Sequence, residues 1–225
     1  YKKEIDLPFI SFGRVGHLSE ERIKIMKDMG CVSLSIGIES GNEELRKRIL
    51  NRHMTNKQII ETFRLCNKHR LRTTAFNLIA LPEEGRKEIF DTIEINRIAR
   101  SSLTPVTFVF PFPGTPLREY CLKKGYIIGN EPFVNYDLDT IIKNEKISKE
   151  EQLGLQKTFV LYVLAPKWMY PIIKLCESND PSINKIYRVM VNHFSEINFK
   201  NDSRVEEVKD TRKLSVLENP PLEDF

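Results

Sequence analysis

The chain has 225 residues, enough for one well-buried core or for one domain with an appendage. Its hydrophobic content of 40% and charged content of 29% are those of an ordinary globular protein. The net charge of +4 is spread over both halves of the chain, so no nucleic-acid partner is expected. No apolar run approaches the roughly 20 residues of a membrane span, and no signal-peptide core is present, which favours a cytoplasmic location.

The first half of the chain alternates short apolar runs with amphipathic helical runs. Ser19, Asn42 and Thr55 are typical helix caps. Strands are predicted over residues 7–12, 31–38, 71–81 and 104–110. Helices are predicted over residues 20–29, 43–50, 87–100 and 117–124, with a further helix that begins after Thr55. This order predicts four consecutive βα units with parallel strands.

The second half loses this rhythm. Residues 126–147 are predicted to be irregular, and helices are predicted over residues 148–164 and 181–194. From residue 200 the chain is charged and carries two prolines near its end, so a frayed tail is expected.

Three sequence blocks lie where predicted strands end, which is where barrels place their sites. The first is GIESGNEELRK, followed by Asn51 and Arg52; the second is a strand that ends N-x-I-x-L-P; the third is the turn PFPGTPL. In this order and spacing they resemble the C-terminal two-thirds of the core domain of radical S-adenosylmethionine (SAM) enzymes, over about residues 7–128. The subgroup that often carries an upstream cobalamin-binding domain is the most similar.

The resemblance implies an α/β fold, an incomplete TIM-type (β/α)6 barrel of which this chain would supply about four βα units and a C-terminal helical extension. The expected division is residues 1–128 for the barrel part, 129–199 for the extension and 200–225 for a flexible tail. The family's cluster motif, C-x3-C-x2-C, does not occur here, and the four cysteines are too scattered to form a metal site. The cluster ligands are therefore expected in a segment before Tyr1.

By resemblance, the intact protein would use a [4Fe–4S] cluster to cleave SAM reductively to a 5′-deoxyadenosyl radical. Its substrate would be a small or unknown molecule, and its electrons would come from a reductant such as flavodoxin or ferredoxin. Cobalamin, in an upstream domain, is implied only by the likeness to the subgroup. This chain would cradle SAM and would be inactive in isolation, so no catalytic residue is assigned in it.

Glu39, Ser40 and Arg52 follow the second predicted strand. The resemblance implies that Glu39 and Ser40 contact the ribose or methionine part of SAM, and that Arg52 clamps the methionine carboxylate. The residues themselves also allow plainer interpretations: Glu39 could cap the next helix, and Arg52 could be a solvated surface arginine.

Asn77 and Ala80 lie near the end of the third predicted strand, and the turn Pro111, Phe112 and Pro113 follows the fourth. The resemblance implies that the Asn77 amide meets the ribose and that the proline turn borders adenine. Ala80 departs from the family's usual glycine, and its methyl group is expected to narrow the approach to adenine. Alternatively, Asn77 satisfies a neighbouring backbone group and the prolines only stiffen a corner.

Two other interpretations remain open at this point. The chain could be a truncated or degenerate relative that keeps the fold without catalysis. It could also be an unrelated (β/α)8 barrel, which would need eight strands in a closed ring rather than four in an open crescent.

Overall fold

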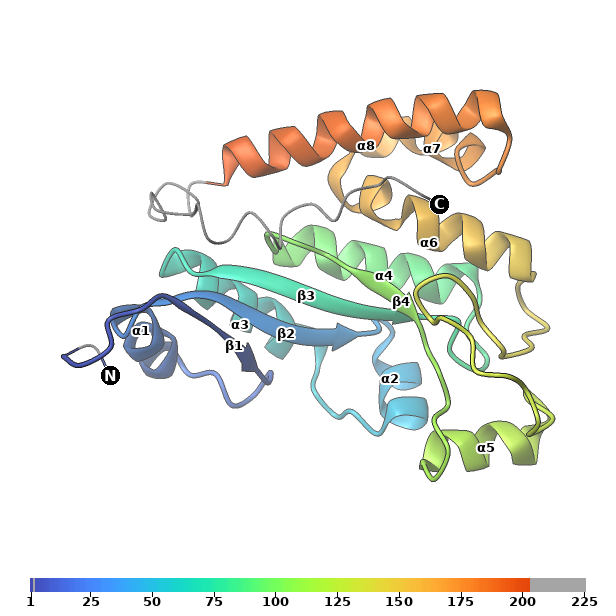
Figure 1. Cartoon of the computed structure of the whole chain (residues 1–225), viewed down its shortest axis with the longest axis horizontal. Helices are drawn as coiled ribbons and strands as arrows, with labels where there is room; N and C mark the ends of the chain where they lie inside the picture. Colours follow the sequence, from blue (N-terminus) through green and yellow to red (C-terminus); the bar gives the residue numbers. More distant parts are fainter. Residues whose placement is uncertain (2, 203–225) are drawn as a thin grey trace.

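A computed structural model of the chain describes residues 1 and 3–202, and its centre is one four-stranded sheet (Figure 1). All pairings are parallel and the strand order is β1-β2-β3-β4. The predicted α/β class with four parallel βα units is confirmed. The strands are β1 (Phe9–Gly13), β2 (Cys31–Glu39), β3 (Arg72–Ile79) and β4 (Val106–Phe108).

The last strand is shorter than the predicted range of 104–110. Pro105 has no N–H group for a ladder, although its carbonyl still accepts a bond of 3.1 Å from the Asn77 N–H. On the outer side of β4, the Phe108 N–H donates to the Tyr136 carbonyl at 2.8 Å. The irregular segment that follows α5 therefore lies along the free side of β4.

The helices of the barrel part begin where their caps predicted. Ser19, Asn42 and Thr55 each accept a backbone N–H from the first turn, and Thr55 forms a full capping box with Gln58. These side chains satisfy backbone donors that a helix leaves unpaired. The helices are α1 (Glu20–Asp28), α2 (Glu43–Leu50), α3 (Asn56–Lys68), α4 (Arg86–Ala99) and α5 (Pro116–Lys124).

The C-terminal extension consists of α6 (Lys149–Leu164), a short 3-10 turn (Lys167–Met169), α7 (Tyr170–Leu175) and α8 (Pro181–Asn201). Helix α8 runs seven residues beyond the predicted end at residue 194, and the Asn198 amide near its end donates to the Ser102 carbonyl at 3.1 Å. Of the tail predicted from residue 200, residues 203–225 lie outside the described residues.

The core lies on one side of the sheet. Apolar side chains of β2 and β3 pack against α1, α3 and α4, while β4 and α4 pack against α6, which in turn carries α8 (Figure 1). A smaller cluster at the carboxyl ends of the strands joins α2 to α5. Fully buried members of these clusters include Ile36, Phe63, Phe108, Phe159 and Cys121.

Two arginines on α4 hold both ends of α6. Near the start of α4, the Arg86 guanidinium binds Glu151, in the first turn of α6, at 2.9 Å. Three turns later, Arg97 donates to the carbonyls of three residues at the end of α6, at 2.7 to 2.8 Å. Arg86 also binds Glu177, just beyond α7, through two bonds of 2.6 and 2.9 Å.

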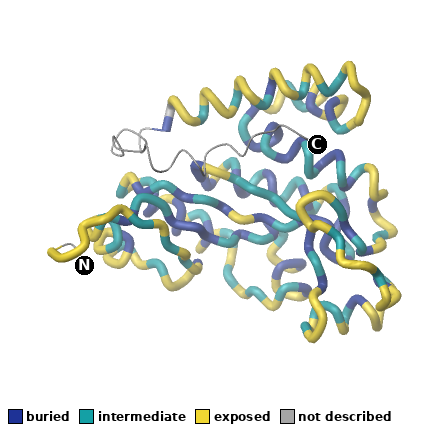
Figure 2. The backbone as a smooth tube through the Cα atoms, viewed as in Figure 1, coloured by how far each residue is buried: buried dark blue, intermediate teal, exposed yellow. Residues whose placement is uncertain are grey.

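The other side of the sheet carries exposed apolar side chains. Phe12 in β1 is 81% exposed and Phe76 in β3 is 41% exposed, and each alternates with less exposed neighbours in its strand. Helix α8 is also exposed along most of its outer surface (Figure 2). None of the helices in residues 1 and 3–202 is long and apolar enough to cross a membrane.

Candidate functional site

The carboxyl end of β2 carries a local irregularity that turns its last residue. The register with β3 shifts between Gly37 and Glu39, and Glu39 has a left-handed backbone with φ of 68°. Such a conformation is uncommon for a residue other than glycine. Because Ile36 and Ile38 face the buried core, Gly37 and Glu39 share the open face with Phe76, which pairs with Gly37.

Glu39 and Arg52 are brought together at this end of the sheet. The Arg52 guanidinium lies 2.9 Å from the Glu39 carboxylate, whose side chain is 14% exposed while that of Arg52 is 37% exposed. Burial raises the pKa of the Glu39 carboxyl, and the nearby Arg52 lowers it by a smaller amount. A Cβ atom on Gly37 would lie 2.5 Å from the Glu39 carboxylate, so glycine leaves the space that this side chain occupies.

Ser40 and Gly41 are inside the protein. Ser40 is fully buried, and its hydroxyl accepts the Asn42 N–H at 3.3 Å within the turn. A Cβ on Gly41 would lie 2.1 Å from the Asp91 carbonyl, so this glycine lets α4 pack directly against the turn. The hydroxyl of Ser40 therefore serves the turn in this structure, and its contact with SAM stays a prediction.

A buried arginine that the sequence analysis did not single out shapes this turn. Arg46 in α2 is fully buried and donates to the Ser40 carbonyl, to the Met54 carbonyl at 2.6 Å and to the Asn56 side chain at 3.0 Å. These bonds connect the turn after β2 to the segment after α2, which carries Arg52. The sequence places Arg46 in the same block as Glu39, and this proximity is the signal that could have identified it.

Asn77, which was expected to meet the ribose of SAM, makes its contacts inside the protein. Its side chain is 2% exposed and points toward α4, where its amide exchanges bonds of 2.7 and 3.4 Å with that of Asn96. The same amide donates to the Ala75 carbonyl at 2.8 Å. Because side chains alternate along a strand, Asn77 lies on the face opposite Phe76. Glu39 is the register partner of Asn77, but the irregularity in β2 turns its carboxylate toward Gly37. The plainer interpretation, a strand asparagine that satisfies nearby backbone, describes it.

The turn after β3 is also built differently from the expectation. Ala80 is fully buried with φ of 60°, and its methyl group packs in the core cluster with α4 and α6. Glu84 is fully buried too, and one of its oxygens accepts the Leu81 N–H at 3.1 Å. Burial raises the pKa of Glu84 to about 8.

An ion-pair network holds this second turn from the outside. Arg48 of α2 lies 2.9 Å from the Glu83 carboxylate, which also accepts the Tyr120 hydroxyl of α5. These two bonds lower the pKa of Glu83 to about 2, and the pKa of Tyr120 rises to about 12 because of its bond to Glu83. The network ties α2, the turn and α5 into one rim.

The proline turn after β4 has a buried start and an exposed tip. Pro111 is buried and its carbonyl accepts the Arg118 side chain at 3.1 Å, whereas Phe112 and Pro113 are exposed. Phe110 and Phe112 form a cluster with two rings from the irregular segment 126–147, Phe133 and Tyr136. The sequence analysis did not identify these two partners, which lie more than twenty residues further along the chain.

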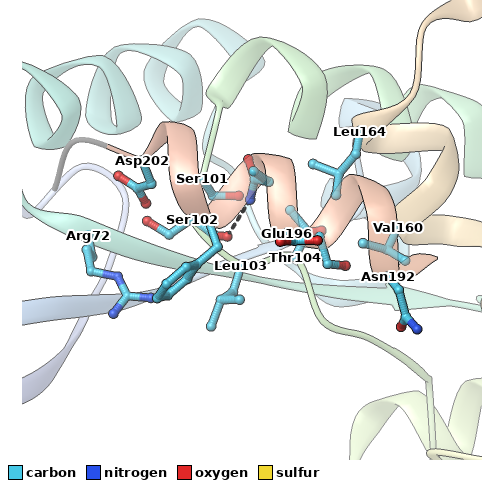
Figure 3. Close-up of a pocket in the computed structure, with 13 residues that line it drawn as sticks. Arg72, Ser101, Ser102, Leu103, Thr104, Val160, Leu164, Asn192, Glu196 and Asp202 are labelled. Atoms are coloured by element: carbon cyan, nitrogen blue, oxygen red, sulfur yellow. Dashed lines mark hydrogen bonds between the residues drawn. The ribbon is translucent and has the colours of Figure 1, made fainter. Parts of the chain in front are cut away.

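A cavity beside the extension lies at the opposite end of the sheet. It has a volume of about 520 Å³ and lies between α8, α6 and the loop that precedes β4 (Figure 3). Ser102 and Asn198 line it and are joined by the bond described above. Arg72, the first residue of β3, lines the cavity. Glu39 lies beside Asn77, near the other end of β3, so the cavity is remote from Glu39.

The described residues do not fit an iron–sulfur cluster. All four cysteines are buried and none is in a disulfide, and residues 1 and 3–202 hold no group of three or more His, Cys, Asp or Glu side chains that could bind a metal. Burial raises the pKa of the Cys31, Cys121 and Cys176 thiols, which disfavours the thiolate that a cluster needs. By contrast, a carboxylate beside a guanidinium suits the charges and hydroxyls of SAM.

Comparisons with known proteins bear on the same region. Residues 2–95 match the family model of the radical SAM superfamily. An uncharacterised methyltransferase of Pyrococcus horikoshii is 25% identical over 164 residues, which cover 72% of this chain and 36% of that protein. A biotin synthase of Persephonella marina is 28% identical over 103 residues, which cover 46% of this chain and 30% of that protein. The chain thus spans about a third of these relatives.

Among solved structures, the radical SAM methyltransferase TsrM of Kitasatospora setae, bound to tryptophan and a SAM analogue, aligns with a TM-score of 0.53. The alignment covers 92% of this chain and 47% of that chain at 12% identity. At this identity the likeness concerns the fold, and it agrees with a partial barrel that continues into a C-terminal extension.

Proposed function

We propose that the chain belongs to the radical SAM superfamily, whose family model matches residues 2–95, and that it forms the SAM-cradling part of a longer enzyme of that superfamily. The observation that carries the proposal is the Glu39–Arg52 pair at the carboxyl end of β2. The longer protein would cleave SAM reductively to a 5′-deoxyadenosyl radical. A reductant such as flavodoxin or ferredoxin would supply the electron, and the substrate would be a small molecule.

The [4Fe–4S] cluster would deliver one electron to bound SAM, and its ligands would come from outside this chain. Within the chain, the Glu39 carboxylate would accept hydrogen bonds from the ribose diol. Arg52 would turn from Glu39 to the carboxylate of the methionine part, since a guanidinium binds carboxylates in a bidentate geometry. Pro111 and its neighbours would border the adenine, and Arg46 would hold Ser40 and Arg52 in place.

The pairing of Glu39 with Arg52 also gives the free site a defined charge arrangement. Because each group neutralises the other, the half-buried carboxylate is not left alone before SAM arrives. SAM brings its own positive and negative groups, so binding would exchange one ion pair for new charge-assisted bonds. The site would therefore keep both side chains oriented before the cofactor binds.

Cobalamin remains a more specific proposal. The chain resembles the subgroup that carries an upstream cobalamin-binding domain, and one of the relatives above is described as a methyltransferase. The cobalamin would belong to the longer protein. Its presence can be tested by the absorption spectrum of the intact protein as purified.

The first test uses SAM affinity in the intact protein. We expect Glu39→Ala and Arg52→Ala each to weaken SAM binding by about tenfold or more, since each removes a charge-assisted contact. The matched control is the ion pair of Arg64 and Glu61 on α3, which has a similar distance of 2.7 Å but is exposed. Alanine at either control position should leave SAM affinity unchanged. Normal SAM binding by both site variants would contradict the assignment.

The second test addresses the chemistry. The intact protein, incubated with SAM and a reductant, should release 5′-deoxyadenosine, which mass spectrometry detects. The 225-residue chain alone should gain no visible cluster absorbance after iron–sulfur reconstitution, because its thiols are buried and apart. A stoichiometric cluster bound by this chain alone would overturn the assignment of the ligands to another segment. Intact protein that binds SAM without cleaving it would support the degenerate relative instead.

A further inference from the structure

The aromatic cluster beyond β4 consists of four rings contributed by two segments. Phe110 and Phe112 come from the turn after β4, and Phe133 and Tyr136 come from the irregular segment before α6. Ring centroids lie 4.8 Å apart for Phe110–Phe112, 5.2 Å for Phe110–Phe133, 6.2 Å for Phe112–Tyr136 and 6.4 Å for Phe133–Tyr136. The contacts form a closed circuit, and all four are edge-to-face.

Three of the four rings are exposed, although each ring contacts two others in the cluster. Phe133 is 69% exposed, Phe112 is 48% exposed and Tyr136 is 37% exposed. An aromatic side chain that is fully buried removes about 150 to 250 Å² from water, so this exposure leaves much apolar surface unused. The backbone bond from Phe108 to the Tyr136 carbonyl fixes the second segment against β4. The rings are therefore held in place without being covered by the described residues.

The position of the cluster connects it to the proposed SAM site. Two of its rings belong to, or directly precede, the proline turn that would border the adenine. The other two belong to the extension and continue the same surface away from that turn. A group that lies against Phe133 and Tyr136 would therefore lie next to the adenosyl part of SAM, where a substrate must be to react.

We propose that Phe110, Phe112, Phe133 and Tyr136 form the substrate wall of this site and that the substrate presents a flat aromatic ring to it. The substrate role rests on the proposed function. Ring pairs that meet edge-to-face gain about 0.5–1.5 kcal/mol beyond the burial of area, which favours an aromatic group over a saturated one of the same size.

The test uses the 225-residue chain, because the whole cluster lies within it. The probe is 2-naphthol, and its matched saturated analogue is decahydro-2-naphthol, with binding followed by saturation-transfer NMR. We expect 2-naphthol to bind more tightly than the saturated probe. Phe133→Ala and Phe133→Leu should each weaken 2-naphthol by about tenfold, because leucine keeps apolar volume but removes the ring.

Ile128→Ala is the matched control, since Ile128 is also 69% exposed but lies outside the ring cluster. It should leave the affinity for 2-naphthol unchanged. Equal affinity for the two probes, or an unchanged affinity in Phe133→Ala, would overturn the proposal. An equal loss in Ile128→Ala would do the same, because it would indicate a general apolar surface.

A second arm uses the intact protein and separates the two proposals. Phe133→Ala should leave SAM affinity within about twofold of the unmodified protein while weakening 2-naphthol by the same factor as in the chain alone. If the intact protein does not bind 2-naphthol at all, another part of it covers the rings and the substrate wall is wrong. If 2-naphthol binds as expected but no 5′-deoxyadenosine is made, the proposed function fails while the aromatic site remains.

Discussion

The turns that follow β2 and β3 are neighbours with similar backbones, yet they carry different chemistry. Each contains a glutamate in the left-handed region, Glu39 with φ of 68° and Glu83 with φ of 66°. After β2, the carboxylate faces the open side of the sheet and pairs with Arg52. After β3, Glu84 is turned into the core, where backbone N–H groups are its partners. A position at the end of a strand is therefore insufficient to define a site. The side chain must also lie on the open face of the sheet, as that of Glu39 does.

The difference has a physical origin in the neighbouring helices. The buried Arg46 of α2 donates to the carbonyl of Ser40. Arg52, which follows α2, is the arginine that pairs with Glu39. The turn after β3 has Arg48 only on its outer side, where Glu83 and Tyr120 bind it. Burial is the main reason that the pKa of Glu84 rises to about 8, and the nearby Glu88 carboxylate acts in the same direction, so this carboxyl keeps its proton at neutral pH.

The largest loss of unfolding free energy from a single substitution is expected in the turn after β2, where Arg46 is buried. Arg46→Met fills the volume but leaves buried carbonyl acceptors without a donor, so unfolding free energy should fall by about 3 kcal/mol. Arg48→Met, on the exposed side of the same helix, should cost at most about 1 kcal/mol. Urea denaturation of the chain measures both. Equal losses would mean that the buried arginine does not organise the turn after β2.

The second prediction is that the unfolding free energy depends on pH through Glu84, in the turn after β3. The pKa of Glu84 is about 8 in the folded chain, above its ordinary value of 4.5, so between these pH values the folded state holds the extra proton. The stability contributed by the protonated carboxyl is therefore complete below about pH 4.5 and is lost as the pH rises through about 8. Unfolding free energy should fall by up to about 1.4 kcal/mol per pH unit in this window.

Glu84→Gln should remove this slope, because glutamine keeps an acceptor for the Leu81 N–H but does not titrate. The control is Glu83→Gln, since the pKa of Glu83 is lowered to about 2. Its contribution is present above about pH 4.5 and is lost only in acid, so the slope between pH 5 and 8 should persist in this variant. A slope that survives in Glu84→Gln would assign the dependence to another group.

The smallest effect concerns the strained alanine of the second turn. Ala80 and Ala75 are both fully buried, but Ala80 has φ of 60° and Ala75 lies within the regular part of β3. Replacing Ala80 by glycine relieves a conformational cost of about 1 kcal/mol that Ala75→Gly cannot relieve. Ala80→Gly should therefore destabilise the chain by about 1 kcal/mol less than Ala75→Gly in thermal or urea unfolding. Equal losses would indicate an unstrained turn.

Much of the fold could be predicted from local signals. The starts of three helices were predicted without knowledge of contacts, from the caps Ser19, Asn42 and Thr55. The end of α8 was predicted seven residues early, because exposed polar residues near a helix end resemble a tail. The short β4 depended on Pro105 and on a partner segment, Tyr136, that lies far along the sequence.

The candidate site was less predictable than the fold. A strand-end motif located Glu39 and Arg52, but their pairing required the bulge in β2, which no single residue encodes. The resemblance implied that Asn77 meets the ribose, whereas its bonds to Asn96 of α4 depend on tertiary packing that could not be read from sequence. The contribution of Phe133 to an aromatic cluster depends on how an irregular segment returns to β4, which is a tertiary property.

One feature of the extension has a mechanical consequence. Because Arg86 and Arg97 grip opposite ends of α6 from a single helix, α6 cannot tilt or slide relative to the last βα unit without breaking both attachments. Helix α8 packs chiefly on α6 and so is one step removed from the sheet. In amide hydrogen exchange, α6 should therefore open together with α4, and α8 should open earlier and alone.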